Sequence, residues 1–176
     1  ANTIINEEGK LNAYNTDCIG IEKAIAEVVD SIKGMNVLLI GAGGVARAAL
    51  YQLKKSGVCN IDICNRNLAK AEKLSSEFSV SSVPYEDIQK NNLESYDLIV
   101  NATPLGSIHL NDSSMFPFSY DTLTNKHIVF DMVTKNTELL RQAEKRGTKI
   151  IAGHRMLLYQ ALEQFKLFTN LEAPKE

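Results

Sequence analysis

The sequence predicts an α/β fold built around a doubly wound parallel sheet, and two features of its 176 residues carry this prediction. The first is the stretch 37–49, VLLIGAGGVARAA, in which a short apolar run, a glycine turn and a helix-forming segment follow one another directly. The second is the alternation of strand-like and helix-like stretches that continues to Ala152, which is typical of βαβ units with right-handed crossovers. Composition agrees, because 44% apolar and 23% charged residues are ordinary values for a globular protein.

Local patterns predict each element in turn. Short extended pieces at 2–5 and 11–14 flank a polar turn at 6–10. Apolar residues then recur at helical spacing up to Ile32, so we expect a helix over 19–33 that stops at Gly34. The expected strands are 37–40, 61–64, 80–83, 96–102, 127–132 and 149–152. The expected later helices are the one from the glycine turn to 56, then 68–78, 137–146 and 154–168.

Two parts of the chain lie outside this alternation. The polar segment 105–126 is expected to be a long loop with a short helical turn, serving either as a flap over a site or as an ordinary surface loop. The helices at 19–33 and 154–168 need not belong to the sheet layers. They would frame a second lobe that is mostly absent from these residues.

The glycine turn predicts a dinucleotide site. Gly41, Gly43 and Ala46 match the pattern G-x-G-x-x-G/A, placed between a strand and a helix. The first glycine permits the tight turn, the second lets a pyrophosphate approach the backbone, and the small third residue lets helix and strand pack closely. The N–H groups at the helix start would then face the phosphates. This is the pattern of a Rossmann-type domain, which we expect to run from 35 to 153.

The residues after the second strand favour NADP over NAD. NAD-dependent enzymes usually place an acid there for the ribose 2′-hydroxyl, but here Asn65, Arg66 and Asn67 follow the strand, with Lys70 one turn later. The nearby acid, Asp62, lies within the strand. A guanidinium and an ammonium at this corner suit a 2′-phosphate. The alternative is that these cations merely solvate the start of a helix.

Charge and composition argue against several other classes. The net charge of −2, with both signs interspersed, predicts no attraction to nucleic acid or membranes, and no apolar run approaches the ~18 residues of a spanning helix. The unpatterned cysteines (Cys18, Cys59, Cys64) and the lack of a visible signal peptide favour the cytoplasm. The three histidines (His109, His127, His154) have no metal-ligand spacing, so we expect no metal site. Monomer and homodimer both remain open.

Several short motifs follow one another along the chain in a fixed order. They are Asn2-Thr3, Asn15-Thr16-Asp17, GAGGVARA, Asn65-Arg66, Asn101-Ala102-Thr103-Pro104, Asp131-Met132-Val133 and the final Gly153-x-x-Met156-Leu157-x-x-Gln160-Ala161. Together they resemble the shikimate dehydrogenase family, also called the shikimate/quinate dehydrogenase family, whose members reduce 3-dehydroshikimate with NADPH in aromatic amino-acid biosynthesis. The resemblance covers almost the entire chain, which is similar to the C-terminal two-thirds of the longer family polypeptide. It implies a remnant of the substrate lobe at 1–34, an NADP-binding domain at 35–153, and a helix at 154–176 returning toward that lobe.

The resemblance also implies roles for individual residues. Asp17 would be the catalytic half of a Lys–Asp acid–base pair, although the residues alone also fit a helix N-cap or first-turn acid. Substrate would be bound by Asn2, Asp17, Thr134 and Gln160. NADP would be bound by Gly41, Ala42, Gly43, Gly44, Val45, Asn65, Arg66, Asn67, Lys70, Asn101, Ala102, Thr103, Met132 and Gly153.

The sequence departs from the family pattern at positions that affect the expected turnover and the expected substrate. The family's catalytic lysine and serine pair lie in an N-terminal lobe with no counterpart in these residues, so we expect NADP binding but poor turnover, if any. Thr134 stands where many members have a tyrosine that faces substrate, and Cys18 where glycine is common. A quinate or dual quinate/shikimate dehydrogenase is therefore an alternative. A non-catalytic NADP(H)-sensing module and the tail of a multifunctional polypeptide are further alternatives.

Overall fold

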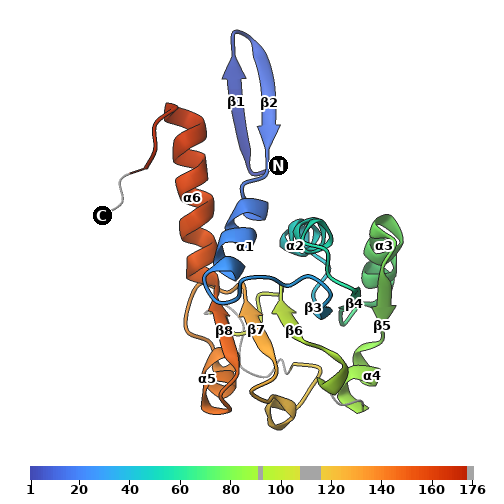
Figure 1. Ribbon diagram of the computed structural model, residues 1–176. Coiled ribbons are helices and arrows are strands. Elements are labelled where there is room, and N and C mark those ends of the chain that lie inside the picture. Colours follow the sequence, from blue (N-terminus) through green and yellow to red (C-terminus); the bar gives the residue numbers. More distant parts are fainter. Residues whose placement is uncertain (91–92, 108–115, 174–176) are drawn as a thin grey trace.

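The computed structural model describes residues 1–90, 93–107 and 116–173. Its centre is a six-stranded parallel sheet in the order β5-β4-β3-β6-β7-β8 (Figure 1). The strands of this sheet are β3 (Asn36–Ile40), β4 (Asn60–Cys64), β5 (Ser81–Val83), β6 (Leu98–Asn101), β7 (Ile128–Asp131) and β8 (Lys149–Ala152). An antiparallel hairpin of β1 (Thr3–Glu7) and β2 (Lys10–Tyr14) stands apart from it, beside the upper part of α6. The predicted doubly wound α/β fold is therefore confirmed.

Helices cover both faces of the sheet. They are α1 (Asp17–Ala26), α2 (Gly44–Lys55), α3 (Leu68–Phe78), α4 (Tyr85–Lys90), α5 (Glu138–Lys145) and α6 (Gly153–Thr169), with short 3₁₀ turns η1 (Leu93–Ser95) and η2 (Tyr120–Thr122). Alternate residues of β3 belong to different cores, because Leu39 packs with α1, α2 and α3 whereas Leu38 packs with α4 and α5. Full burial of one such side chain contributes about 2 kcal/mol. This explains why β3 is a continuous apolar run.

The strand order places a topological switch point between β3 and β6. The chain leaves β3 toward β4 on one side, and the later strands β6, β7 and β8 add on the other side. Backbone hydrogen bonds continue past the strand ends, from Gly41 N to Cys64 O at 2.8 Å and from Ala102 N to Ile40 O at 2.8 Å. In open α/β sheets, ligands bind in the crevice that opens at this point.

Helices α1 and α6 pack closely beyond the carboxyl end of the sheet (Figure 1). Gly20 of α1 makes this possible, since a Cβ there would lie only 2.6 Å from the carbonyl oxygen of Met156. At the other end of α1, Glu27 accepts hydrogen bonds from Arg155 and from the hydroxyl of Tyr159. The two helices therefore form one unit, which lies above the β7 and β8 side of the sheet in Figure 1.

Most predicted elements are present, but some boundaries were wrong. The helix expected over 19–33 is α1, which begins at Asp17 and ends at Ala26. Its C-terminal part is replaced by a turn in which the amides of Val28 and Val29 both donate to the carbonyl of Ile25. Ile32 is still buried against the core from this turn, so apolar spacing at helical intervals was satisfied without a helix.

Smaller differences concern the middle and the end of the chain. Helix α4 and the 3₁₀ turn η1 were not predicted, and α6 begins at Gly153 and ends at Thr169. The weak third strand is confirmed as β5, and η2 is the short helical turn expected within 105–126. Residues 108–115 of that segment, with His109, lie outside the described residues. No helix in the described ranges has the length and apolar character needed to cross a membrane.

Candidate functional site

A cavity of about 480 Å³ lies at the carboxyl edge of the sheet, beneath α1 and α6. It brings together three of the predicted substrate residues, Asp17, Thr134 and Gln160. It also brings together predicted cofactor residues from helices α2 and α6 and from the segments after β6 and β7, namely Val45, Ala102, Thr103, Met132 and Gly153. The remaining lining residues are Pro104, Ser107, Val133, Met156 and Leu157. Residues from both ends of the chain therefore converge on one space.

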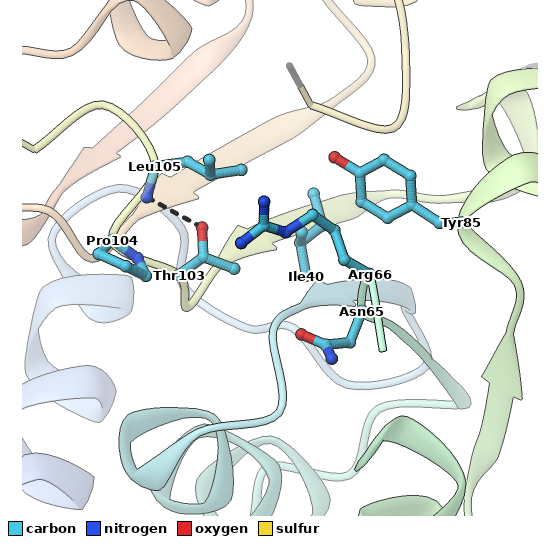
Figure 2. A pocket seen from close by; sticks show the side chains of 7 residues that line it. All are labelled: Ile40, Asn65, Arg66, Tyr85, Thr103, Pro104 and Leu105. Carbon is cyan, nitrogen blue, oxygen red and sulfur yellow. Dashed lines mark hydrogen bonds between the residues drawn. The ribbon is translucent and has the colours of Figure 1, made fainter. Parts of the chain in front are cut away.

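A second, smaller pocket of about 110 Å³ lies on the β4 side of the same edge (Figure 2). It is lined by Ile40, Asn65, Arg66, Tyr85, Thr103, Pro104 and Leu105. Figure 2 shows the Arg66 side chain extending across the pocket toward the segment 103–105. Because Thr103 and Pro104 border both spaces, the two form neighbouring compartments along one edge.

The glycine turn has the geometry that a bound diphosphate needs. Gly41 has a φ of +116°, and a Cβ there would lie 2.8 Å from the carbonyl oxygen of Ala102, so only glycine fits. By contrast, Gly43 and Gly44 are exposed, and a Cβ at either would meet no atom within 4 Å. Packing within the described residues therefore does not require glycine at these two positions, and the start of α2 is open to a ligand. Residue 46, a buried alanine, packs where helix and strand are in contact.

The corner after β4 presents two cations. Asn67 caps α3 by accepting the amide of Lys70 at 3.3 Å, and the side chain of Asn65 donates to the carbonyl of Asn67 at 2.9 Å. These bonds fix the turn that carries Arg66. Arg66 and Lys70 are exposed, and neither makes an ion pair within the described ranges. Both charges are thus available to an anion. Arg66 lines the small pocket, whereas Asn67 and Lys70 line neither pocket.

Asn2 connects two residues that line the large cavity, Asp17 and Gln160, without lining it itself. Its amide nitrogen lies 3.0 Å from Oδ1 of Asp17, 3.0 Å from Oγ1 of Thr16 and 3.2 Å from Oε1 of Gln160. Its amide oxygen accepts the backbone N–H of Thr16 at 3.0 Å. Since the oxygen of Gln160 faces Asn2, the NH₂ group of Gln160 remains available as a donor.

Asp17 is the first residue of α1, and Thr16 is the N-cap. The N-cap interpretation of Asp17 was therefore wrong in position, while its place as an acid in the first helical turn is confirmed. A carboxylate here is favoured by the positive end of the helix dipole. The same side chain lines the large cavity, so a place in the first turn of α1 is compatible with the catalytic role that the family resemblance implies.

A buried polar network lies under the segment shared by the two pockets, and the sequence reasoning did not predict it. Asp131 is completely buried and accepts hydrogen bonds from Nδ2 of Asn101 at 2.9 Å, from the amide of Val133 at 3.0 Å and from the hydroxyl of Thr137. Burial raises the pKa of Asp131, while the three hydrogen bonds oppose this rise. The detectable signal was an Asn and an Asp, each at the end of a neighbouring parallel strand, where they are paired in register.

Two of the three histidines lie within the described residues, and neither lines one of the two pockets. His127 is buried, and its Nδ1 accepts the amide of Thr124 at 2.9 Å, while burial lowers its pKa. His154 is exposed at the start of α6. Among the residues that the structure describes, no three His, Cys, Asp or Glu side chains are grouped so that they could hold a metal ion.

Comparison with known proteins gives a consistent result. Residues 23–143 match the family described as Shikimate / quinate 5-dehydrogenase, and residues 153–176 match the Shikimate 5'-dehydrogenase C-terminal domain. Shikimate dehydrogenase (NADP(+)) of Aquifex aeolicus is 38% identical over 175 residues, which cover 98% of this chain and 62% of that protein. The chain thus spans about 62% of the length of this relative.

Solved structures agree with the sequence match. Shikimate 5-dehydrogenase from Thermus thermophilus, in complex with NADP(H) and shikimate, superposes with a TM-score of 0.79 and 31% identity, covering 97% of this chain and 62% of that one. Quinate dehydrogenase from Corynebacterium glutamicum, in complex with NAD, superposes with a TM-score of 0.83 and 30% identity, covering 96% and 62%. The chain therefore belongs to the shikimate/quinate 5-dehydrogenase family.

Proposed function

We propose that this chain carries the NADP-binding part and half of the substrate site of a shikimate dehydrogenase, which interconverts 3-dehydroshikimate and shikimate. One observation carries the proposal, namely that Asp17 and Gln160 share a single cavity with Val45, Met132 and Gly153. The first two are the residues expected at substrate, and the other three are expected at the cofactor. The name of the Aquifex aeolicus relative supports both the substrate and NADP.

The cofactor would lie along the two compartments at the carboxyl edge. Its adenosine end fits the small pocket, where Arg66 and the nearby Lys70 would neutralise a 2′-phosphate. The diphosphate fits the open space at Gly43 and Gly44, facing the N–H groups at the start of α2. The nicotinamide end would then reach the large cavity beside Met132 and Gly153. When bound, NADP supplies or accepts the hydride.

The chain's own residues orient substrate and supply Asp17, one member of the acid–base pair. Asn2 holds one oxygen of the Asp17 carboxylate, and the other oxygen has no hydrogen-bond partner in the described part of the chain. That oxygen can accept a hydrogen bond from a substrate hydroxyl or from an ammonium group. Gln160 donates from its NH₂ group to a second hydroxyl. A ligand that lacks such a hydroxyl leaves these groups unpaired, which is the basis of selectivity.

The reacting oxygen gains or loses a proton during hydride transfer, and this proton transfer requires a second acid–base group beside Asp17. The family resemblance assigns this role to a lysine in an N-terminal lobe, and no lysine lines the large cavity within the described ranges. A positioned general acid contributes roughly 10²–10⁴-fold to the rate. We therefore expect these 176 residues to bind NADP but to oxidise shikimate poorly. The boundaries of the NADP-binding domain would lie near residues 34 and 153.

A quinate or dual quinate/shikimate dehydrogenase is the second candidate. The structure of the Corynebacterium glutamicum quinate dehydrogenase supports it, because its TM-score of 0.83 is close to the 0.84 of the Aquifex aeolicus shikimate dehydrogenase structure. The two substrates are both cyclic polyols, so the fold alone does not separate them. Thr134, which lines the large cavity, is the residue whose size would influence the choice.

Calorimetric titration of the purified 176-residue chain with NADP tests the proposal. NADP binding that is strengthened by shikimate supports the dehydrogenase, and stronger coupling to quinate favours the second candidate. NADP binding that is indifferent to every cyclic polyol favours a non-catalytic sensor. Absence of NADP binding contradicts the proposal altogether, whereas measurable shikimate oxidation by the chain contradicts only its expected catalytic incompleteness.

A further inference from the structure

Asp131 is a buried carboxylate that the proposed chemistry does not use. It ends β7, and its side chain is completely shielded from solvent although it lines neither pocket. A buried carboxylate is costly unless donors surround it. The position of those donors relative to the two pockets therefore indicates what the residue does.

The donors come from three separate elements. Asn101 ends β6 and donates from Nδ2 at 2.9 Å, Val133 donates its backbone amide at 3.0 Å, and Thr137 donates its hydroxyl from the N-cap of α5. The first two donors cannot accept a hydrogen bond in return. The hydroxyl oxygen of Thr137 accepts the amide of Leu140 at 3.3 Å, while its O–H donates to Asp131. The arrangement therefore fits an ionised carboxylate that joins β6, the segment after β7 and α5.

The network continues from Asn101 to the wall between the pockets. Oδ1 of Asn101 accepts both the amide of Thr103 at 3.0 Å and its hydroxyl at 2.6 Å. The hydroxyl oxygen of Thr103 accepts the amide of Leu105 at 3.2 Å, which is the dashed line in Figure 2. Thr103 borders both pockets, Leu105 borders the small one, and Val133 borders the large one.

We propose that Asp131 is a positioning residue that joins the walls of the two pockets, so that a ligand in the small pocket also orders the wall of the large cavity. One carboxylate oxygen, Oδ1, receives both the bond from Asn101 and the bond from Val133. A displacement of the segment 103–105 is therefore transmitted to Val133 through that single atom. The inference rests on the proposed function for the identity of the ligand, NADP.

The first experiment compares NADP affinity in two matched variants. Asp131→Asn keeps the shape of the side chain but replaces one carboxylate oxygen by an NH₂ group, which cannot accept the hydrogen bonds made to that position. Asp62→Asn is the control, because Asp62 also lies in the sheet, accepts one hydrogen bond from Tyr96 at 2.8 Å and lines neither pocket. We expect the Kd for NADP to rise about tenfold in Asp131→Asn and to change less than about twofold in Asp62→Asn. Equal affinities in the two variants overturn the inference.

The second experiment separates coupling from a purely structural role. Adenosine 2′,5′-bisphosphate carries the adenosine end of NADP without its nicotinamide end, so it fits the small pocket and does not reach Val133. In ¹H–¹⁵N spectra of the whole chain, we expect this probe to shift the amides of both Thr103 and Val133. In Asp131→Asn only the Thr103 amide should shift. A Val133 amide that is unmoved in the original chain, or that moves equally in the variant, contradicts the inference.

A further pair of variants keeps the test decisive if Asp131→Asn does not fold. Thr137→Val removes one donor to Asp131 while keeping the side-chain shape, and Thr137→Ser restores the hydroxyl. Weaker NADP binding in Thr137→Val with recovery in Thr137→Ser supports the inference, and identical affinities in the two contradict it. If the original chain does not bind NADP, the proposed function fails and the inference fails with it. Failure of the inference alone appears as unchanged affinity in a chain that binds NADP.

Discussion

The side-chain amide of Asn2 lies 3.0 Å from the carboxylate of Asp17, although the hairpin β1–β2 separates the two residues in sequence. The same nitrogen lies 3.2 Å from the oxygen of Gln160 on α6. One amide group thus connects the start of the chain, α1 and α6. It also determines which atoms of Asp17 and Gln160 remain available to a ligand in the large cavity.

Replacement of Asn2 by alanine should therefore weaken substrate binding without affecting the cofactor. Without the amide, Gln160 can turn its oxygen toward the cavity, and Asp17 loses the bond that holds it. We expect the Kd for shikimate, measured calorimetrically with NADP present, to rise about tenfold. Asn12→Ala is the matched control, because Asn12 donates to Glu7 within the same hairpin at 2.7 Å. An equal effect of both changes on shikimate binding would mean that the hairpin as a whole, rather than Asn2, is responsible.

Arg66→Ala should reduce the preference for NADP over NAD. Arg66 is exposed, lines the small pocket and makes no ion pair in the described ranges, so its charge is available to a 2′-phosphate. A charge-assisted hydrogen bond contributes about 1.5 kcal/mol or more, so loss of Arg66 should change the affinity ratio by at least about tenfold. Arg141→Ala is the control, since Arg141 is paired with Glu138 on α5. An unchanged ratio in Arg66→Ala would place the 2′-phosphate elsewhere.

Replacement by alanine should destabilise the fold at one glycine of this turn and leave it nearly unchanged at another. Gly41→Ala introduces a side chain at a φ of +116° and 2.8 Å from the carbonyl oxygen of Ala102, so we expect a loss of about 2–4 kcal/mol in the free energy of unfolding. Gly43→Ala places its Cβ in open space with extended backbone, so stability should change by less than about 1 kcal/mol.

NADP affinity should nevertheless fall in Gly43→Ala, because the new methyl group occupies the space proposed for the diphosphate. Urea unfolding and calorimetric titration measure the two properties separately. A Gly43→Ala chain that binds NADP as tightly as the original would show that the diphosphate does not approach this glycine.

The contrast between these glycines and Asp131 explains how far the sequence could predict the structure. The strand, turn and helix around Gly41 are contiguous, so their local pattern was sufficient. The network of Asn101 and Asp131 depends on the register of two neighbouring strands, and no local pattern contains that information. The predicted end of α1 was wrong for a related reason, because Ile32 can be buried from a turn as well as from a helix. The convergence of Asp17 and Gln160 was anticipated through family resemblance, since residues so distant in sequence cannot be paired from spacing alone.

The last prediction concerns the acid stability of the contact between α1 and α6. Hydrogen bonds from Arg155, and secondarily from Tyr159, lower the pKa of Glu27 from 4.5 to about 2. A carboxyl group whose pKa is lower in the folded state stabilises the fold fully above its unfolded pKa, and this contribution is lost as the pH falls through the folded pKa. For Glu27 the contribution should thus be complete above about pH 4.5 and should disappear toward about pH 2.

Glu27→Gln tests this expectation. The side chains of Glu27 and Arg155 are 29% and 39% exposed, so solvent screens the pair and we expect a loss of only about 1 kcal/mol at pH 7. Urea unfolding at pH 7, 5, 4 and 3 should show the difference between the two chains shrinking only in the most acidic samples. Glu22→Gln is the control, because Glu22 of α1 forms a longer, exposed ion pair of 3.8 Å with Lys55 of α2, and the amide oxygen of the variant can still accept the hydrogen bond from Gln52, so stability should change little. A difference between Glu27→Gln and the original chain that persists undiminished at pH 3 would show that the ionised carboxylate is not what holds these two helices together.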